Sequence, residues 1–282
     1  MIVERADEAR ARGGGYPIAS RMLQVTADVP AHTHEFCELA VVTTGRCGYR
    51  TRRGGLEVGP GAVMVVRPGE WHAYDVDRPV EVFNVYVGTE LLTREFSWVR
   101  EHPALVDLWW RGGELAEPLS SDALARVVGW LRQIEQRRRA EDPIGAVQLR
   151  SLLDCALCEF VPDPPAGADR QSRGLSAPVM GVLAMVEEDP ARPWTVGELA
   201  HEVAVSSSHL HRLFRQELDS SPVEWLSRTR AEQMASRLSA GDEPVGVIGA
   251  AVGWGDPNYA ARRFRTVFGL SPTQYREQYA SR

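Results

Sequence analysis

A ten-residue pattern occurs twice near the C-terminus, fifty residues apart. Residues 213–222 are LFRQELDSSP and residues 263–272 are RFRTVFGLSP. The Phe, the Arg that follows it and the closing Ser-Pro coincide in the two copies, and an aromatic residue stands three positions after each Pro, as Trp225 and Tyr275. A repeat of this kind predicts one structural unit that is used twice.

The first copy completes a pair of short helices. Thr195 and Glu198 have the spacing of a capping box, and an apolar stripe with helical spacing follows them. The stripe consists of Val196, Leu199, Ala200 and Val203. After a break at 204–205, Ser206 caps a second stripe, which consists of Leu210, Leu213, Phe214 and Leu218. Two short helices joined by a tight turn predict a helix-turn-helix, whose second helix enters the major groove of DNA.

The outward face of that second helix carries short hydroxyls and hydrogen-bond donors. Its members are Ser207, Ser208, His211, Arg212 and Arg215. Such side chains suit contacts with base edges and phosphates.

The second copy has the same parts. Residues 245–252 form an apolar helical stripe, residues 253–255 predict a turn, Asp256 is a cap, and Pro257 stands at the first helical position, where its missing N–H costs nothing. The core side is expected to hold Tyr259, Phe264, Val267 and Phe268, and the outward side Asn258, Ala261, Arg262 and Arg265. A longer helix over 222–240 is expected to join the two units.

The stretch from about residue 193 to residue 279 resembles the DNA-binding domain of the AraC/XylS family of transcription regulators. The matching segments include 194–195, 198–200, 210–215, 252–254, 264–265, 268–272 and 275–276. The resemblance implies two helix-turn-helix units that contact successive major-groove segments. It places the base-reading positions at Ser207, Ser208, His211 and Arg212 in the first unit and at Pro257, Asn258, Ala261 and Arg262 in the second.

Two positions depart from the family's pattern. Ala204 stands in the first turn where the family usually has Gly, and a positive φ there would cost about 1 kcal/mol. Asp219 ends the first recognition helix where Gly269 ends the second. Pro257 and Ala261 offer no side-chain hydrogen bond, so the first unit is expected to carry more of the specificity.

The charge balance limits non-specific DNA binding. The chain has a net charge of −6, and all 32 of its basic residues are Arg. Residues 178–282 contain 11 Arg against 13 Asp and Glu. Because non-specific affinity comes from phosphate neutralisation, we expect it to be modest, with a few well-placed arginines at the groove.

The N-terminal part predicts a small β-barrel. Short segments rich in β-branched and aromatic residues occur at 40–44, 49–51, 62–66 and 80–87, separated by Gly and Pro turn signals. Several short strands at this spacing are typical of a barrel or jelly roll.

A histidine cluster is expected inside this barrel. His32, His34 and Glu38, followed later by His72, resemble the two cupin motifs, although Arg67 stands where a Pro is often found and the usual Asn does not follow His72. Residues two apart on a strand share a face, so these side chains are expected to converge. Three imidazoles and a carboxylate could hold a divalent transition metal.

Three interpretations of the cluster remain open. It binds a polar effector such as a sugar, together with Tyr49, Trp71, Tyr74 and Asn84. It holds a metal, or the histidines make buried hydrogen bonds only. A cupin enzyme is a further alternative, but a barrel enzyme fused to two DNA-binding units would be unusual, and we expect no enzymatic activity.

The middle of the chain predicts helices and a linker. Residues 91–161 have helical apolar spacing, which suits covering the barrel or, as in the resembling family, dimerisation. Residues 162–177 are rich in Pro, Gly and Ser and predict a flexible linker. Cys155 and Cys158 are expected to be buried small apolar residues.

These observations predict an α+β chain with four segments: a cupin-like effector barrel (1–90), a helical segment (91–161), a linker (162–177) and an all-α DNA-binding domain (178–282). The N-terminus has no apolar core of a secretory signal, and no apolar run reaches membrane-spanning length. The expected protein is a cytoplasmic transcription regulator. Its expected partners are double-stranded DNA, a small effector, a second copy of itself and RNA polymerase.

Overall fold

The computed structural model describes residues 2–4, 18–34, 36–88, 91, 95–109, 113–115, 117–137, 143–161 and 175–279. It divides into two compact units, one of residues 1–96 with 107–168 and one of residues 97–106 with 169–282. The predicted linker lies outside the described residues from 162 to 174. Residues 97–106, expected within the N-terminal helical segment, group with the C-terminal unit, where Arg100 forms an ion pair with Glu187.

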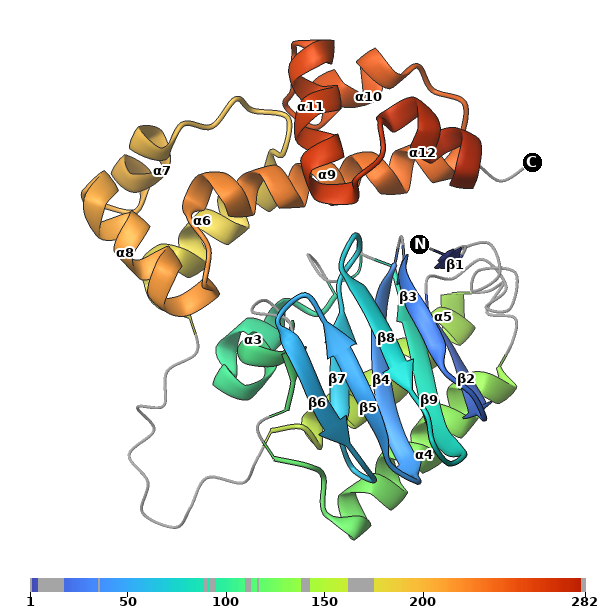
Figure 1. Ribbon diagram of the computed structural model, residues 1–282. Coiled ribbons are helices and arrows are strands. Elements are labelled where there is room, and N and C mark those ends of the chain that lie inside the picture. Colours follow the sequence, from blue (N-terminus) through green and yellow to red (C-terminus); the bar gives the residue numbers. More distant parts are fainter. Residues whose placement is uncertain are drawn as a thin grey trace, which may run out of the picture. The chain divides into compact units, whose positions relative to one another are not determined.

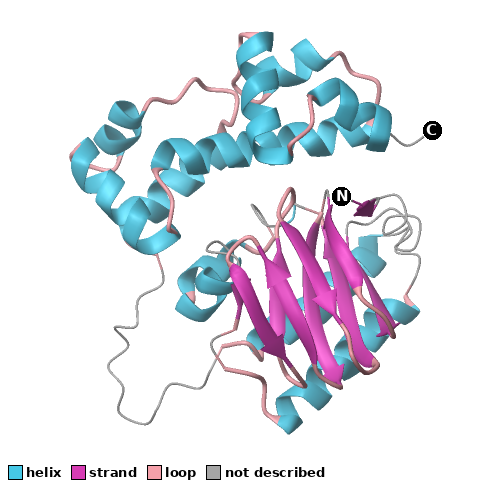
Figure 2. Ribbon diagram, in the orientation of Figure 1, coloured by secondary structure: helices cyan, strands magenta, loops and turns pink. Residues whose placement is uncertain are grey.

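The N-terminal unit consists of two five-stranded sheets (Figures 1 and 2). The first has the order β1 (Ile2–Glu4), β3 (Val29–His34), β8 (Trp71–Asp75), β5 (Cys47–Thr51) and β6 (Gly54–Val58). The second has the order β10 (Gly113–Glu114), β7 (Val63–Val66), β4 (Cys37–Thr44), β9 (Val80–Val87) and β2 (Ile18–Val25). The predicted α+β class and the cupin-like barrel are confirmed.

Alternate residues of both sheets form one core. Inward-facing side chains from β4, β7 and β9 meet those of β5, β6 and β8 in a single buried cluster, which includes Val42, Tyr49, Met64, Tyr74 and Val82. The period of two along each strand explains why these residue types alternate with polar ones on the edge strands. The interior of the barrel is therefore largely filled by apolar and aromatic side chains.

Helices cover the outer face of the second sheet. A 3-10 helix η1 (Ser97–Glu101) and α3 (Pro103–Trp109) precede α4 (Ser121–Gln136) and α5 (Pro143–Cys158). α4 packs on β2, β9 and α5 (Figure 1). The hydroxyl of Ser20 donates to the carbonyl oxygen of Leu131 at 2.6 Å, and the backbone N–H of Met22 donates to the Glu135 carboxylate at 3.2 Å. These bonds tie edge strand β2 to α4.

α4 is capped by Ser120, whose side chain accepts a hydrogen bond from the Ala123 N–H. One local prediction in these helices needs correction. Cys155 and Cys158 are exposed, because α5 buries the face that contains Leu149, Leu153, Ala156 and Leu157. Cys37 and Cys47 are buried barrel residues.

The C-terminal unit is all-α. It contains α6 (Ala177–Glu188), α7 (Val196–Glu202), α8 (Ser207–Leu218), α9 (Pro222–Ala240), α10 (Val245–Ala251), α11 (Pro257–Phe268) and α12 (Pro272–Tyr279). α7 with α8 and α10 with α11 are the two predicted helix-turn-helix units, and α9 packs against members of both (Figure 1). Among the described residues, none of the helices combines the length and apolar character needed to cross a bilayer.

The two units end their first helices in the same way. Ala204 donates to the carbonyl oxygen of His201 and Val205 to that of Ala200, and Gly253 and Trp254 make the equivalent bonds to Ala250 and Gly249. Ala204 has φ +55° and Gly253 has φ +84°. Ala204 therefore has the strained positive φ for which the cost was given above, and Asp219 likewise adopts φ +49° at the end of α8.

Candidate nucleic-acid interface and effector site

α8 and α11 present the predicted DNA-contacting side chains to solvent. All eight are exposed: Ser207, Ser208, His211, Arg212 and Arg215 on α8, and Asn258, Arg262 and Arg265 on α11. Pro257 is also exposed, and Ala261 is half-buried. The opposite face of each helix is buried, through Leu210, Phe214 and Leu218 in α8 and through Ala260, Phe264 and Phe268 in α11. Each helix therefore has one face in the core and one free for a ligand.

Each recognition helix begins at a side-chain cap. Ser206 accepts a hydrogen bond from the backbone N–H of His209 at 3.1 Å, and Asp256 accepts one from Tyr259 at 2.7 Å. These bonds satisfy N–H groups that have no partner inside the helix. They also fix the first turn, which in a helix-turn-helix lies closest to the bases.

Tyr259 was expected on the core side of α11, and that prediction is wrong. Its side chain is 39% exposed, because Ala260, Phe264 and Phe268 define the buried stripe and Tyr259 lies beside it. The ring packs edge-on against Trp254 of the turn, with centroids 6.5 Å apart, and the guanidinium of Arg262 lies 5.5 Å from its centroid. Tyr259 thus belongs to the same exposed face as the predicted DNA contacts.

His209 is a second residue that the sequence analysis did not select. It is half-buried at the start of α8, and its Nδ1 lies 2.9 Å from an Nη of Arg212. The sequence could have shown this pair of residues. When the two copies are aligned, His209 coincides with Tyr259, and Arg212 coincides with Arg262. Each copy thus has a ring three residues before an arginine.

Arg215 is tied to the start of α9. An Nη of its guanidinium lies 3.0 Å from the Glu224 carboxylate, and both side chains are more than half exposed. The pair is therefore worth little in stability. In the second copy, Gln274 stands at the sequence position equivalent to Glu224, so the counterpart of Arg215, Arg265, has no acid there.

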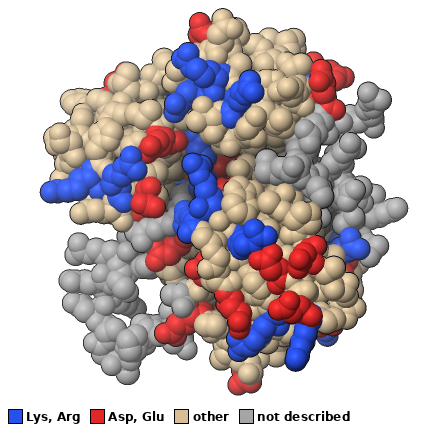
Figure 3. Space-filling view, in the orientation of Figure 1, with Lys and Arg blue, Asp and Glu red and all other residues tan. Residues whose placement is uncertain are grey.

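Basic and acidic groups are interspersed on the molecular surface. Figure 3 shows arginine side chains alternating with Asp and Glu over the visible face of the described residues. This distribution agrees with the net charge of −6. The described residues on the visible face present no broad basic surface. DNA binding would therefore depend on a few positioned arginines.

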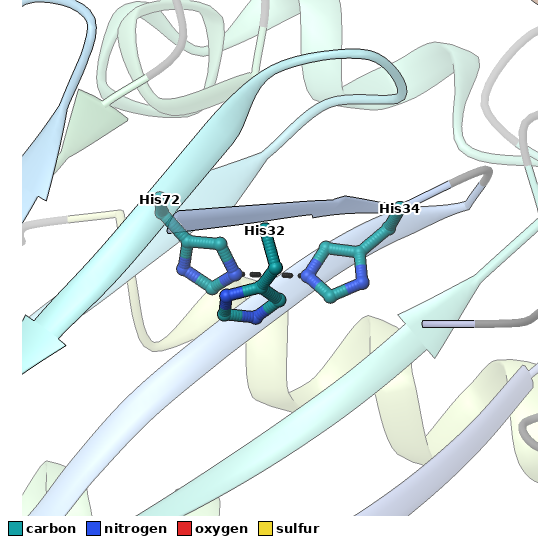
Figure 4. Close-up of side chains that lie close together, drawn as sticks. All are labelled: His32, His34 and His72. Atoms are coloured by element: carbon teal, nitrogen blue, oxygen red, sulfur yellow. Dashed lines mark hydrogen bonds between the residues drawn. The ribbon is translucent and has the colours of Figure 1, made fainter. Parts of the chain in front are cut away.

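Inside the barrel, three imidazoles converge. His32 and His34 extend from β3 and His72 from β8, which is paired with β3 so that His32 lies opposite His72 (Figure 4). The Nε2 atoms of His34 and His72 are 2.8 Å apart, and one ligand-type nitrogen from each of the three rings lies within 4.8 Å of the others. Glu38 of β4 faces them, with its oxygens 3.5 Å from the His34 Nε2 and 3.7 Å from the His72 Nε2.

The environment favours the neutral form of His34 and His72. All three histidines and Glu38 are buried. Burial of the ring, and then the neighbouring His32, lower the pKa of His34 from 6.5 to about 3. Burial also holds the pKa of His72 well below its usual value, with smaller effects from His34 and His32. Neutral rings each keep one nitrogen lone pair for a ligand.

The protonation of His32 follows from its hydrogen bond. Its Nδ1 lies 2.9 Å from the carbonyl oxygen of Pro30. A carbonyl oxygen can only accept, so Nδ1 carries a proton, and in the neutral tautomer with this bond Nε2 keeps its lone pair. A backbone carbonyl in this position orients the ring in the way that supporting groups orient metal-binding histidines.

The other expected effector residues separate into two groups. Tyr49 and Tyr74 lie beside His72, with ring centroids 5.7 Å and 5.5 Å from it, and Asn84 is buried on β9. Trp71 precedes His72 on β8 and therefore projects from the opposite face of that strand. The structure thus brings Tyr49 and Tyr74 to the histidine cluster and leaves Trp71 outside the group.

Comparisons with known proteins agree with this two-part architecture. Residues 24–153 match the AraC-like ligand binding domain, and residues 199–278 match a helix-turn-helix domain. An AraC-like transcription regulator of Streptomyces antibioticus is 38% identical over 105 residues, which are 37% of this chain and 35% of that protein. The transcriptional activator RhaR of Klebsiella pneumoniae is 24% identical over 270 residues, covering 93% of this chain and 94% of its own.

The fold is also that of a solved structure. The structure of ToxT from Vibrio cholerae superposes with a TM-score of 0.54 over 94% of this chain and all of the other, at 9% identity. A ligand-binding barrel and a double helix-turn-helix in one chain define a two-domain transcription regulator. The chain belongs to the AraC-like family of transcription regulators.

Proposed function

We propose that the chain binds a specific promoter site through α8 and α11, and that an effector bound in the barrel controls this binding. The observation that carries the proposal is the equivalence of the two exposed faces. Both recognition helices present an arginine two residues before the buried Phe214 or Phe264. Hydrogen-bond donors on a capped helix suit a major groove.

The effector can control DNA binding only if it binds two arrangements of the protein with different affinities. We propose that these arrangements differ in how the two units, or two subunits of a homodimer, are held. The same proposal places the protein in the cytoplasm and includes contact with RNA polymerase at the promoter. α4 already covers β2, so dimerisation would use other faces of the helical segment.

Duplex selection from a randomised pool tests the DNA-binding proposal. The full chain is expected to enrich one sequence and to protect two adjacent major-groove segments in a footprint. Arg212→Ala is expected to weaken this binding by about 1–3 kcal/mol. The absence of any enriched sequence, together with no gel retardation at low salt, would refute the proposal.

A polar effector such as a sugar or a related compound is the first candidate ligand. Three buried polar atoms near the barrel interior, the Tyr74 hydroxyl, the Asn84 Oδ1 and the His72 Nδ1, have no hydrogen-bond partner among the described residues. A buried polar atom without a partner costs about 1–3 kcal/mol. A ligand with several hydroxyl groups would satisfy such atoms, which supports this class.

A divalent transition metal is the second candidate, and the histidine cluster favours it. With metal–nitrogen bonds of about 2.0–2.1 Å, neighbouring ligand atoms lie about 3.0–3.4 Å apart. The separations of 2.8, 3.5 and 3.7 Å among the His34, His72 and Glu38 atoms bracket that range. His32, whose Nδ1 is bonded to the Pro30 carbonyl oxygen, completes a set of three imidazoles and one carboxylate that suits such an ion.

Elemental analysis of the purified full chain separates the two candidates. A stoichiometric transition metal that chelation removes, with lower thermal stability after removal, supports the metal-responsive regulator. If no transition metal is found and a sugar raises the melting temperature of the protein in a screen, the result supports the polar effector. His32→Ala and His72→Ala are expected to abolish either response.

A further inference from the structure

The two recognition helices share a pair of side chains that the base-contacting positions do not explain. In α8, His209 lies three residues before Arg212, and in α11, Tyr259 lies three residues before Arg262. In both helices the ring contacts the arginine, through Nδ1 to Nη at 2.9 Å in the first and through the ring face at 5.5 Å in the second. The same spatial relationship therefore occurs twice, with different chemistry.

Each ring is itself held in place. His209 and Tyr259 occupy the third position of their helices, where the backbone N–H is bonded to the cap, at 3.1 Å from Ser206 Oγ and 2.7 Å from Asp256 Oδ1. Tyr259 also rests on buried Trp254 in the turn. The cap thus fixes the backbone that carries each ring, and the ring limits the orientations of the arginine.

Ordering matters for an exposed arginine. A free guanidinium side chain loses rotamer entropy of about 2 kcal/mol when it is fixed on a base. A contact that already fixes it in the unbound protein lowers that cost. The base that a positioned arginine recognises best is guanine, through two parallel hydrogen bonds to O6 and N7.

We propose that His209 and Tyr259 are positioning residues that hold Arg212 and Arg262 for guanine, so that the operator carries one guanine in each of its two adjacent major-groove segments. This inference rests on the proposed DNA-binding function. Each ring would then contribute to the specificity for one base pair. The second unit would also recognise sequence, although Pro257 and Ala261 offer it no side-chain hydrogen bond.

The chemistry of the contact predicts which variants retain it. Arg212 can only donate, so the His209 Nδ1 accepts, and His209→Asn keeps an acceptor whereas His209→Ala removes it. Tyr259→Phe keeps the aromatic face, and Tyr259→Leu removes it while keeping an apolar side chain. Asn258→Ala, next to Tyr259 on the same exposed turn, is the matched control.

The test uses the duplex selected by the full chain and all single-base replacements of it. Arg262→Ala is expected to lose about five- to 150-fold in affinity for the wild-type duplex and to lose the preference for its guanine. Tyr259→Leu is expected to lose about two- to fivefold at that guanine alone, and Tyr259→Phe to bind as the wild type does. His209→Ala is expected to act in the same way at the guanine of Arg212.

A double-mutant cycle completes the test. Tyr259→Leu is expected to have almost no further effect in an Arg262→Ala background, since the ring acts through the arginine. Additive effects, a uniform loss across all duplexes, or a selected sequence without guanine in the two segments would each overturn the inference while leaving DNA binding intact. Failure to select any duplex would overturn the proposed function itself, and the inference with it.

Discussion

Arg230 of α9 donates a hydrogen bond to the carbonyl oxygen of Arg192, with 2.5 Å between the Nη and the oxygen. Arg192 precedes α7, in the first helix-turn-helix unit. The same guanidinium lies against the turn of the second unit, where a Cβ on Gly253 would come within 2.6 Å of it. One buried side chain thus connects the chain before the first unit with the turn of the second.

Arg230→Met is expected to destabilise the C-terminal unit by about 1–3 kcal/mol, because the Arg192 carbonyl loses its partner and a buried contact is lost. Arg237→Met is the control, since Arg237 lies on the same helix as Arg230 and forms an exposed ion pair with Glu243, beyond the end of that helix. This variant should cost less than about 1 kcal/mol. Denaturant unfolding of both variants measures the difference. Equal losses of unfolding free energy in the two variants would show that the contacts of Arg230 contribute no more stability than an exposed ion pair.

The two turns make opposite predictions for Ala and Gly. Ala204→Gly is expected to raise stability by up to about 1 kcal/mol, because Ala204 has φ +55° and Gly adopts positive φ without strain. Gly253→Ala is expected to lower stability by more than that, since its Cβ would also meet the Pro190 carbonyl oxygen at 2.8 Å. Melting temperatures of the two variants check both signs, and a stabilising Gly253→Ala would contradict this account.

Acid should weaken one cap and leave its counterpart unchanged. Hydrogen bonds from the backbone and side chain of Ser221 lower the pKa of Glu224 below 4.5, and Arg215 contributes less. Because the pKa is lowered in the folded state, the stabilisation is present above pH 4.5 and is lost as the pH falls through the lowered value. The equivalent box of Ser271 and Gln274 has no charge to lose.

Glu224→Gln is therefore expected to lower the melting temperature slightly at neutral pH and not at all in strong acid. Gln274→Glu is the reciprocal variant, and it should acquire the pH dependence that Glu224 provides. Thermal melts across the acid range measure both. A Glu224→Gln difference that stays constant with pH would mean that the carboxylate charge is irrelevant.

Changes in the histidine cluster are expected to leave DNA selection intact. His72→Ala removes a ring from the barrel, whereas the recognition helices belong to the other compact unit. The variant should enrich the same duplex as the wild type and lose the thermal shift with zinc or with an active sugar. A variant that folds and still shows the full shift would place the effector site elsewhere.

Local sequence rules predicted the C-terminal unit well. The helix over 222–240 follows from its cap and its apolar spacing, both of which act over a few residues. Tyr259 was misplaced because helical spacing alone does not separate a residue at the edge of the buried stripe from one inside it. Its neighbour Ala260 takes the core position.

The barrel was harder to predict in detail. Strands β2, β3, β6 and β8 have mixed compositions, and their pairing depends on residues far apart in the sequence. His32 lies opposite His72 because of the register between two strands that are forty residues apart in the sequence. No local sequence pattern determines that register. Trp71 could have been excluded, since the period of two places adjacent residues of a strand on opposite faces.

The length of α9 has a consequence for how this sequence can change. Its 19 residues extend about 28 Å, and each residue turns the helix by about 100°. A one-residue insertion in its middle would rotate one copy of the repeat by about 100° around the α9 axis relative to the other. Substitutions within α9 leave this rotation unchanged, whereas the insertion or deletion of a residue alters it. Selection should therefore conserve the fifty-residue distance between the two copies of the repeat more strictly than the identity of the residues between them.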